Sequence, residues 1–153
     1  MENEEKVTVI ATEKSENVVM QNYTMVMFGE AEKGEFRTAY YCKTLSHLVD
    51  YFGNPPPESR GLHFAVQALL YQRDLVFFRV KEEGFSFQDY IEGLHLLENQ
   101  RSIEQIDAIG IPGVGDSEII HALTPLCKIY HSILVLTEAD LCDYLLDSPT
   151  SRA

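Results

Sequence analysis

Short apolar runs alternate along the chain with longer stretches in which apolar residues recur at helical spacing. The short runs have strand length and are rich in β-branched and aromatic residues; they cover residues 7–10, 18–28, 74–80, 106–111 and 131–136. The run at 18–28 is apolar on both faces, which is typical of a strand in a sheet that helices cover on both sides.

The stretches between these runs predict amphipathic helices. We expect them over residues 45–52, 60–73, 86–100, 117–130 and 137–146. Thr44 and Thr137 stand where an N-cap is needed, and Ser86 with Asp89 three residues later resembles a capping box. Gly53-Asn-Pro-Pro-Pro57 is expected to end the first helix, because proline has no amide N–H. The residues spaced for burial include Leu45, Leu48, Val49 and Phe52 on the first helix and Phe87, Tyr90, Ile91, Leu94 and Leu97 on the third.

The order of these elements predicts the fold class. Strands that alternate with helices require crossover connections, which place helices on both faces of a largely parallel sheet. We therefore predict an α/β domain of three αβα layers, with a largely parallel or mixed sheet, over residues 18–147. Residues 1–17 are expected to form a flexible N-terminal arm, and residues 148–153 a frayed tail.

The composition is that of a soluble globular domain with an excess of acidic side chains. The 153 residues suffice for one core, and 24 Asp and Glu against 12 Lys and Arg give a formal net charge of -12 at pH 7. Nucleic acid and anionic membranes are therefore not expected partners, because both are bound through basic side chains. No apolar run approaches the roughly 20 residues that span a bilayer. The start, Met1-Glu-Asn-Glu-Glu-Lys6, lacks the pattern of a secretory signal, so we expect a cytoplasmic protein.

The three cysteines, Cys42, Cys127 and Cys142, are an odd number without dense spacing and are expected to be reduced thiols. Cys127 and His131 lie four residues apart and would hold a metal ion only if Cys142 or His121 joined them. No CxxC or HxxxH pair anchors such a site, so no metal ligand is predicted.

One glycine-rich loop is the best candidate for small-molecule binding. Gly110, Gly113 and Gly115 precede Ser117 between a predicted strand and a predicted helix, where α/β domains often bind ligands and where free N–H groups attract anions. The loop lacks the Lys of a P-loop and the glycine spacing of the dinucleotide fingerprint, and acidic residues follow its last glycine. A turn without a ligand is the main interpretation and no cofactor is predicted. Binding of a small ligand or nucleotide is the alternative function.

No residue pattern typical of a catalytic site is present. The five histidines lie outside hydrolase, protease and metal motifs, and no serine stands in a Gly-x-Ser-x-Gly elbow. The acidic pairs Glu4-Glu5 and Glu82-Glu83 are interpreted as solvated charges beside turns. We therefore predict that the protein is not an enzyme and has no catalytic residues.

Four segments, taken in order, carry a family resemblance. They are Tyr23-Thr-Met-Val-Met-Phe-Gly-Glu-Ala31 with Gly34, Thr44-Leu-Ser-His-Leu-Val-Asp-Tyr-Phe-Gly53, Leu62–Leu70 with Leu75–Val80, and Tyr90–Leu94 with Ile109–Gly113. Together they resemble the core of the contractile-tail sheath family, which forms the sheath of myovirus-like phage tails and related injection machines. The resemblance spans roughly residues 18–146 and implies the same α/β core.

Two motifs depart from the family pattern. Gln72-Arg73-Asp74 stands where the family has a glycine pair, and Leu136-Thr-Glu-Ala-Asp140 stands where it has a D-x-P motif. Family members are also usually longer. The resemblance therefore implies a reduced sheath-like protein, such as a tube-associated or terminating component, rather than a full contractile subunit.

The function that the resemblance implies is structural. We expect a non-enzymatic component of a phage, prophage or injection-machine tail that forms a homo-oligomer or docks to other tail proteins, assembled into a virion or tail-like particle. Sheath lattices in this family are held by an arm that completes a neighbour's sheet. The corresponding segment here contains Val7, Val9 and Ile10, which are the candidate self-association residues. An adaptor for a single protein partner is a third hypothesis.

Overall fold

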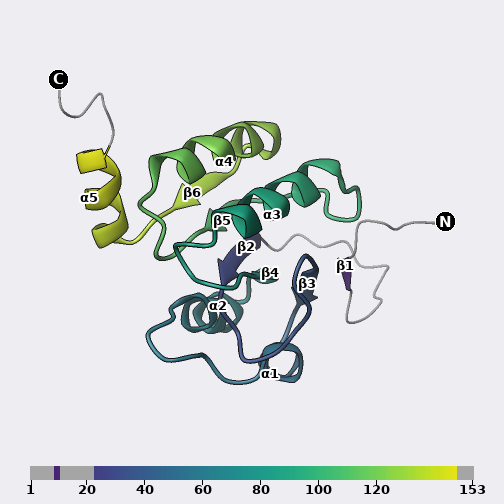
Figure 1. Ribbon diagram of the computed structural model, residues 1–153. Helices are drawn as coiled ribbons and strands as arrows, with labels where there is room; N and C mark the ends of the chain where they lie inside the picture. The colour runs from purple at the N-terminus through teal and green to yellow at the C-terminus, as the bar shows by residue number, and fades with distance from the viewer. Residues whose placement is uncertain (1–8, 11–22, 148–153) are drawn as a thin grey trace.

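The computed structural model describes residues 9–10 and 23–147, which form a mixed sheet between layers of helices (Figure 1). The strands are β1 (Val9–Ile10), β2 (Thr24–Gly29), β3 (Ala39–Cys42), β4 (Asp74–Arg79), β5 (Ala108–Gly110) and β6 (Ile133–Val135), in the spatial order β1-β3-β4-β2-β5-β6. Strands β4, β2, β5 and β6 run parallel to one another, β3 is antiparallel to β4, and β1 is parallel to β3. The predicted α/β domain with a largely parallel, mixed sheet is confirmed.

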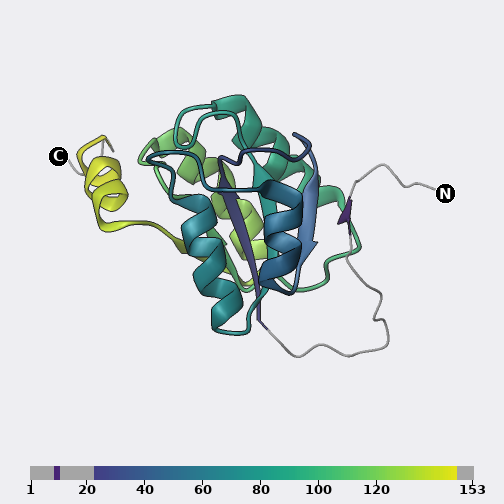
Figure 2. The same cartoon turned by 90° about the horizontal axis from the view of Figure 1, so that it is seen from below.

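Within the described residues, four helices cover the sheet and a fifth stands apart. They are α1 (Leu45–Phe52), α2 (Gly61–Leu70), α3 (Phe87–Asn99), α4 (Ser117–Tyr130) and α5 (Glu138–Asp147). Helices α1 and α2 lie on one face and α3 and α4 on the other, which gives the three predicted layers (Figures 1 and 2). Helix α5 projects from the body beyond the end of β6.

Alternation along the central strands explains why the molecule has two hydrophobic cores. On β2, Val26 and Phe28 belong to the core under α3 and α4, whereas Met27 belongs to the core under α1 and α2. On β4, Phe78 belongs to the core under α3 and α4 and Phe77 to the core under α1 and α2. All five of these side chains on β2 and β4 are 2% exposed or less. Because successive side chains of a strand point to opposite faces, such strands need a helix layer on each side.

Strand β3 is an element that the apolar pattern did not predict. Its four residues pair antiparallel with β4, with Tyr40 opposite Phe77. The neighbouring Tyr41 donates a hydrogen bond to Asp74 Oδ2 at 2.7 Å, and burial is the largest cause that raises the pKa of Tyr41 above its ordinary value. A four-residue strand has too few positions to establish a period, so the pattern contained no clear signal for it.

The predicted N-terminal arm contributes one short strand to the described structure. Val9 and Ile10 form β1, which extends the chain's own sheet beside β3. Val7 and the rest of residues 1–17 lie outside the described residues, as does the tail predicted at 148–153.

The boundaries of several predicted elements differ from expectation, including β5 and β6, which are shorter than the runs predicted at 106–111 and 131–136. Helix α2 ends at Leu70 rather than at Arg73, because Gln72 has a φ of 63° and the Arg73 N–H bonds back to the Ala68 carbonyl at 2.9 Å. Of the strand predicted at 18–28, the described part begins at Thr24.

Helix α1 begins where predicted but buries fewer side chains. Thr44 caps it by accepting a backbone N–H, as expected. Leu48 and Phe52 are buried, whereas Leu45 and Val49 are 38% and 56% exposed. The helix packs mainly on the short strand β3 and on α2, and Phe52 also reaches Phe77 of β4, so two large side chains fill that contact.

The capping box predicted at Ser86 and Asp89 is wrong. Ser86 precedes α3 but makes no side-chain cap; its hydroxyl donates to the Glu82 carbonyl at 3.0 Å, and Asp89 Oδ2 accepts from the Lys81 N–H at 2.7 Å. Both side chains therefore hold the loop before the helix. Phe87 is 41% exposed rather than on the inner face, because it lies one turn before α3 reaches the core.

Candidate functional site

A carboxylate of the chain itself bridges the carboxyl ends of β2 and β4. Glu83, in the loop after β4, accepts hydrogen bonds from the backbone N–H groups of Glu30 at 3.0 Å, Arg60 at 2.6 Å and Gly61 at 3.2 Å. The Glu83 N–H in turn donates to the Glu30 carboxylate at 2.8 Å. Because Arg60 and Gly61 open helix α2, Glu83 occupies the position where a helix N-terminus would bind an external anion.

The interpretation of Glu82-Glu83 as a solvated pair is therefore wrong for Glu83, which is half-buried. Burial raises the pKa of Glu83 above its ordinary value; the three backbone donors oppose this rise, and the Glu30 carboxylate adds to it. The partners of Glu83 lie 22, 23 and 53 residues away in the chain, so local spacing could not reveal them.

Close packing explains the first two glycines of the candidate loop. A Cβ on Gly110 would lie 2.8 Å from both the Sδ and the Cε of Met27, so the missing side chain makes room for this methionine. Gly113 has a φ of 86°, which favours glycine, and its carbonyl occupies the place that a Cβ on Gly84 would need. These glycines let side chain and backbone approach closely inside the chain.

The first turns of helix α5 pack against the rest of this loop. The Gly113 N–H donates to Asp140 Oδ2 at 2.7 Å, and Asp140 is only 6% exposed. A Cβ on Gly115 would lie 2.5 Å from the Cβ of Asp143, so this glycine also makes room for α5. One N–H group of the loop that was the candidate anion site, that of Gly113, is therefore already bonded to an acidic side chain.

The start of helix α4 is capped in the same manner. Asp116 is its N-cap and accepts a hydrogen bond from the Glu118 N–H at 2.7 Å, and Ser117 is the first residue of the helix. Gly110 therefore lies against Met27, whereas acidic side chains of the same chain lie against Gly113, Gly115 and the start of α4 that Ser117 forms.

Helix α5 docks through its polar side. Asp140, Asp143 and Tyr144 share that side, and the Tyr144 hydroxyl lies 2.9 Å from Nε2 of His121 on α4. The opposite side of α5 carries apolar residues that include Leu141, Leu145 and Leu146, which are 45%, 48% and 72% exposed. The usual amphipathic arrangement, with the apolar side inward, is reversed in this helix.

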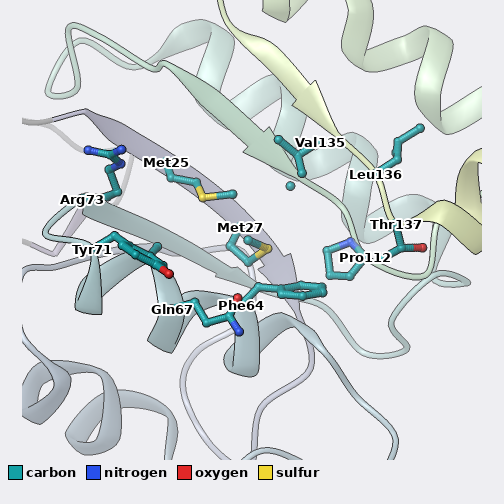
Figure 3. Close-up of a pocket in the computed structure, with 12 residues that line it drawn as sticks. Met25, Met27, Phe64, Gln67, Tyr71, Arg73, Pro112, Val135, Leu136 and Thr137 are labelled. Atoms are coloured by element: carbon teal, nitrogen blue, oxygen red, sulfur yellow. The ribbon is translucent and has the colours of Figure 1, made fainter.

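An apolar groove of about 380 Å³ lies next to the residues that precede α5 and is called the groove beside α2 below (Figure 3). Its sides come from β2, α2, the end of β5 and the segment after β6; the lining residues are Met25, Met27, Phe64, Gln67, Ala68, Tyr71, Arg73, Gly110, Pro112, Val135, Leu136 and Thr137. Helix α2 packs on β2 and β4, and none of the described helices covers this face of β5 and β6. Of the described residues that line the groove, Arg73 alone is charged.

A second cavity, of about 470 Å³, opens at the carboxyl ends of the strands. Five acidic residues line it together with Arg60 and several uncharged residues; they are Glu30, Glu58, Glu82, Glu83 and Asp140. Its charge opposes the binding of phosphate. Among the described residues, no group of three or more His, Cys, Asp or Glu side chains is arranged to hold a metal ion.

The three cysteines are free thiols in separate environments. Cys42 is buried in the core under α1 and α2, and burial raises its pKa to about 12. Cys127 is half-buried on α4, where burial also raises the thiol pKa, and Cys142 is exposed on α5. The hypothetical set of Cys127, His131 and Cys142 or His121 is not assembled in the described structure.

The fold defines the chain as a three-layer α/β domain. Comparison with protein-family models, with curated proteins and with solved structures finds no match for it. None of the helices in the described part of the chain combines the length and the apolar character needed to cross a bilayer.

Proposed function

We propose that the chain is a non-enzymatic structural component of a contractile-tail-sheath-like assembly, and that it acts through self-association or by docking to other tail proteins. The observation that supports this best is the apolar surface formed by the groove beside α2 and the outer side of α5. Apolar patches of this kind on globular domains commonly mark protein interfaces.

The carboxyl-terminal edge of the sheet is occupied by side chains of the same chain, which also favours a structural role over ligand binding. Open α/β sheets usually bind small ligands at this edge, and here Glu83 and Asp140 accept the N–H groups that would hold an anion. The assignment to a tail rests on the ordered motifs between residues 18 and 146. On this proposal the protein assembles in the cytoplasm into a virion or tail-like particle.

Native mass tests the self-association. Light scattering on the purified full chain, over a range of concentrations, should give a multiple of the 17.4 kDa chain mass. A single-chain mass at every concentration would contradict it. Deletion of residues 1–17 should lower the oligomer mass if Val7, Val9 and Ile10 act as an exchanged arm, and an unchanged mass would exclude that role for the arm.

Binding of a small ligand or nucleotide at Gly110–Ser117 remains the alternative proposal. A phosphate group would have to displace Asp140 from the Gly113 N–H inside an acidic cavity, so we expect nucleotides and phosphorylated metabolites to leave the thermal unfolding midpoint unchanged. Reproducible stabilisation by one of them that is lost in Gly113→Val would favour the alternative.

A further inference from the structure

We infer that the groove beside α2 receives helix α5 from a second copy of the chain, and that the exchange is reciprocal in a twofold dimer. Leu141, Leu145 and Leu146 of one copy would enter the groove of the other. This inference rests on the self-association proposed above and assigns its surface.

The first argument is the reversed docking of α5. Its polar side is held by the Gly113 N–H and by His121, while its apolar side faces outward. The free energy falls when apolar side chains leave water, so a helix that exposes three leucines needs a further surface to cover them.

The second argument is that the exposed side of α5 and the groove are both mainly apolar and carry opposite charges. The groove is lined mainly by apolar side chains, and within the part of the chain that the structure describes Arg73 is its one charged residue. Helix α5 has no Lys or Arg, and Glu138 lies on the same side as Leu141 and Leu145. An apolar helix face with one acidic residue therefore complements an apolar groove with one basic residue.

The third argument concerns which copy supplies the helix. Thr137 is the last residue of the groove and also caps α5, because its Oγ1 accepts from the Asp140 N–H at 3.0 Å. To lie in its own groove, α5 would have to swing about this point and release Asp140 from Gly113 and Tyr144 from His121. A second copy can supply the helix face with all of these bonds intact.

Reciprocity follows from the position of the two surfaces. Thr137 lines the groove and caps α5, so each copy presents the two surfaces next to each other. A self-complementary patch of this kind closes as a twofold dimer. Two helix–groove contacts are then formed at once, which helps to reach the roughly 1,200–2,000 Å² typical of a stable interface.

Charge substitutions on each side of the interface test the inference by light scattering. Leu145→Glu and Tyr71→Glu change exposed residues and should each reduce the wild-type dimer to a single-chain mass. Ile129→Glu, at a 60% exposed residue on α4, is the matched control and should remain dimeric. A wild-type dimer that both α5 and groove variants leave intact would overturn the inference while self-association stands. A wild-type monomer would overturn both.

Cross-linking identifies the origin of the helix. In Gln67→Cys, an added thiol on the groove wall should form a disulfide with Cys142 of the other copy when diamide takes up the two thiol protons and two electrons and is reduced to its hydrazine. The expected product has twice the chain mass, and peptide mapping should find the 67–142 pair; Gln67→Cys/Cys142→Ser should lose that pair. A 67–142 disulfide within a single chain, or no such disulfide, would contradict the exchange.

Discussion

Helices α2 and α5 are both ten residues long, yet they meet the rest of the domain through opposite sides. Helix α2 buries Leu62, Ala65 and Leu69 against the sheet. Helix α5 buries Asp140 against a glycine loop and leaves Leu145 exposed. The difference shows that an amphipathic pattern locates a helix, whereas the surface available to it decides which side is buried.

The largest difference between the two helices should appear when one leucine is truncated in each. Leu62 is 2% exposed, so Leu62→Ala should lower the free energy of unfolding by about 2–5 kcal/mol. Leu145→Ala, at a 48% exposed residue, should change it by less than about 0.5 kcal/mol at concentrations where the protein is monomeric. Urea unfolding measures both, and equal losses would show that α5 packs its apolar side within its own chain.

A smaller loss of stability, confined mainly to α5, should follow from removal of the Asp140 carboxylate that holds this helix on the Gly113 loop. Asp140→Ala leaves the Gly113 N–H without its acceptor and should cost about 1–3 kcal/mol. We expect hydrogen exchange of the α5 amides to become faster, while the amides of the central strands stay protected. Asp143→Ala is the control, because it removes a carboxylate from the same side of α5 but keeps the Cβ for which Gly115 makes room. Equal acceleration in both variants would show that general charge, and not the Gly113 hydrogen bond, holds the helix.

The fold class and most elements of this chain could be predicted from its sequence because they depend on period and local chemistry. The spacing of Leu48 and Phe52 located α1, and Thr44 and Thr137 were recognised as caps from their place before a helix. Strand β3 was missed because four residues carry no clear period. The Ser86 capping box was wrong because the serine bonds instead to the loop that precedes it.

The candidate site was predictable only as a location. The glycine spacing predicts a loop between a strand and α4; in the structure Gly110 ends β5, and Gly113 and Gly115 lie in the loop before α4. What occupies the loop depends on Asp140, which lies 27 residues from Gly113, and on contacts with Met27 from another strand. Such long-range contacts leave no local pattern, so the sequence could not distinguish an anion site from a loop closed by its own carboxylates.

The smallest expected effect concerns the carboxylate that anchors α2, as Asp140 anchors α5. Burial raises the pKa of Glu83 above its ordinary value of 4.5, which means that folding favours its neutral form. The stability that Glu83 contributes is therefore fully present below pH 4.5 and is lost as the pH rises through the raised pKa. A nuclear magnetic resonance titration of the Glu83 side-chain carboxyl, assigned with Glu83→Gln, should have its midpoint above 4.5. Urea unfolding should show a fall in stability over the same pH window that is absent in Glu83→Gln, since the amide does not ionise. A midpoint at or below 4.5 would mean that the hydrogen bonds from the backbone N–H groups of Arg60 and Gly61 lower the pKa of Glu83 by at least as much as burial raises it. The start of α2 would then stabilise the charged Glu83 carboxylate, as a helix N-terminus stabilises an external anion.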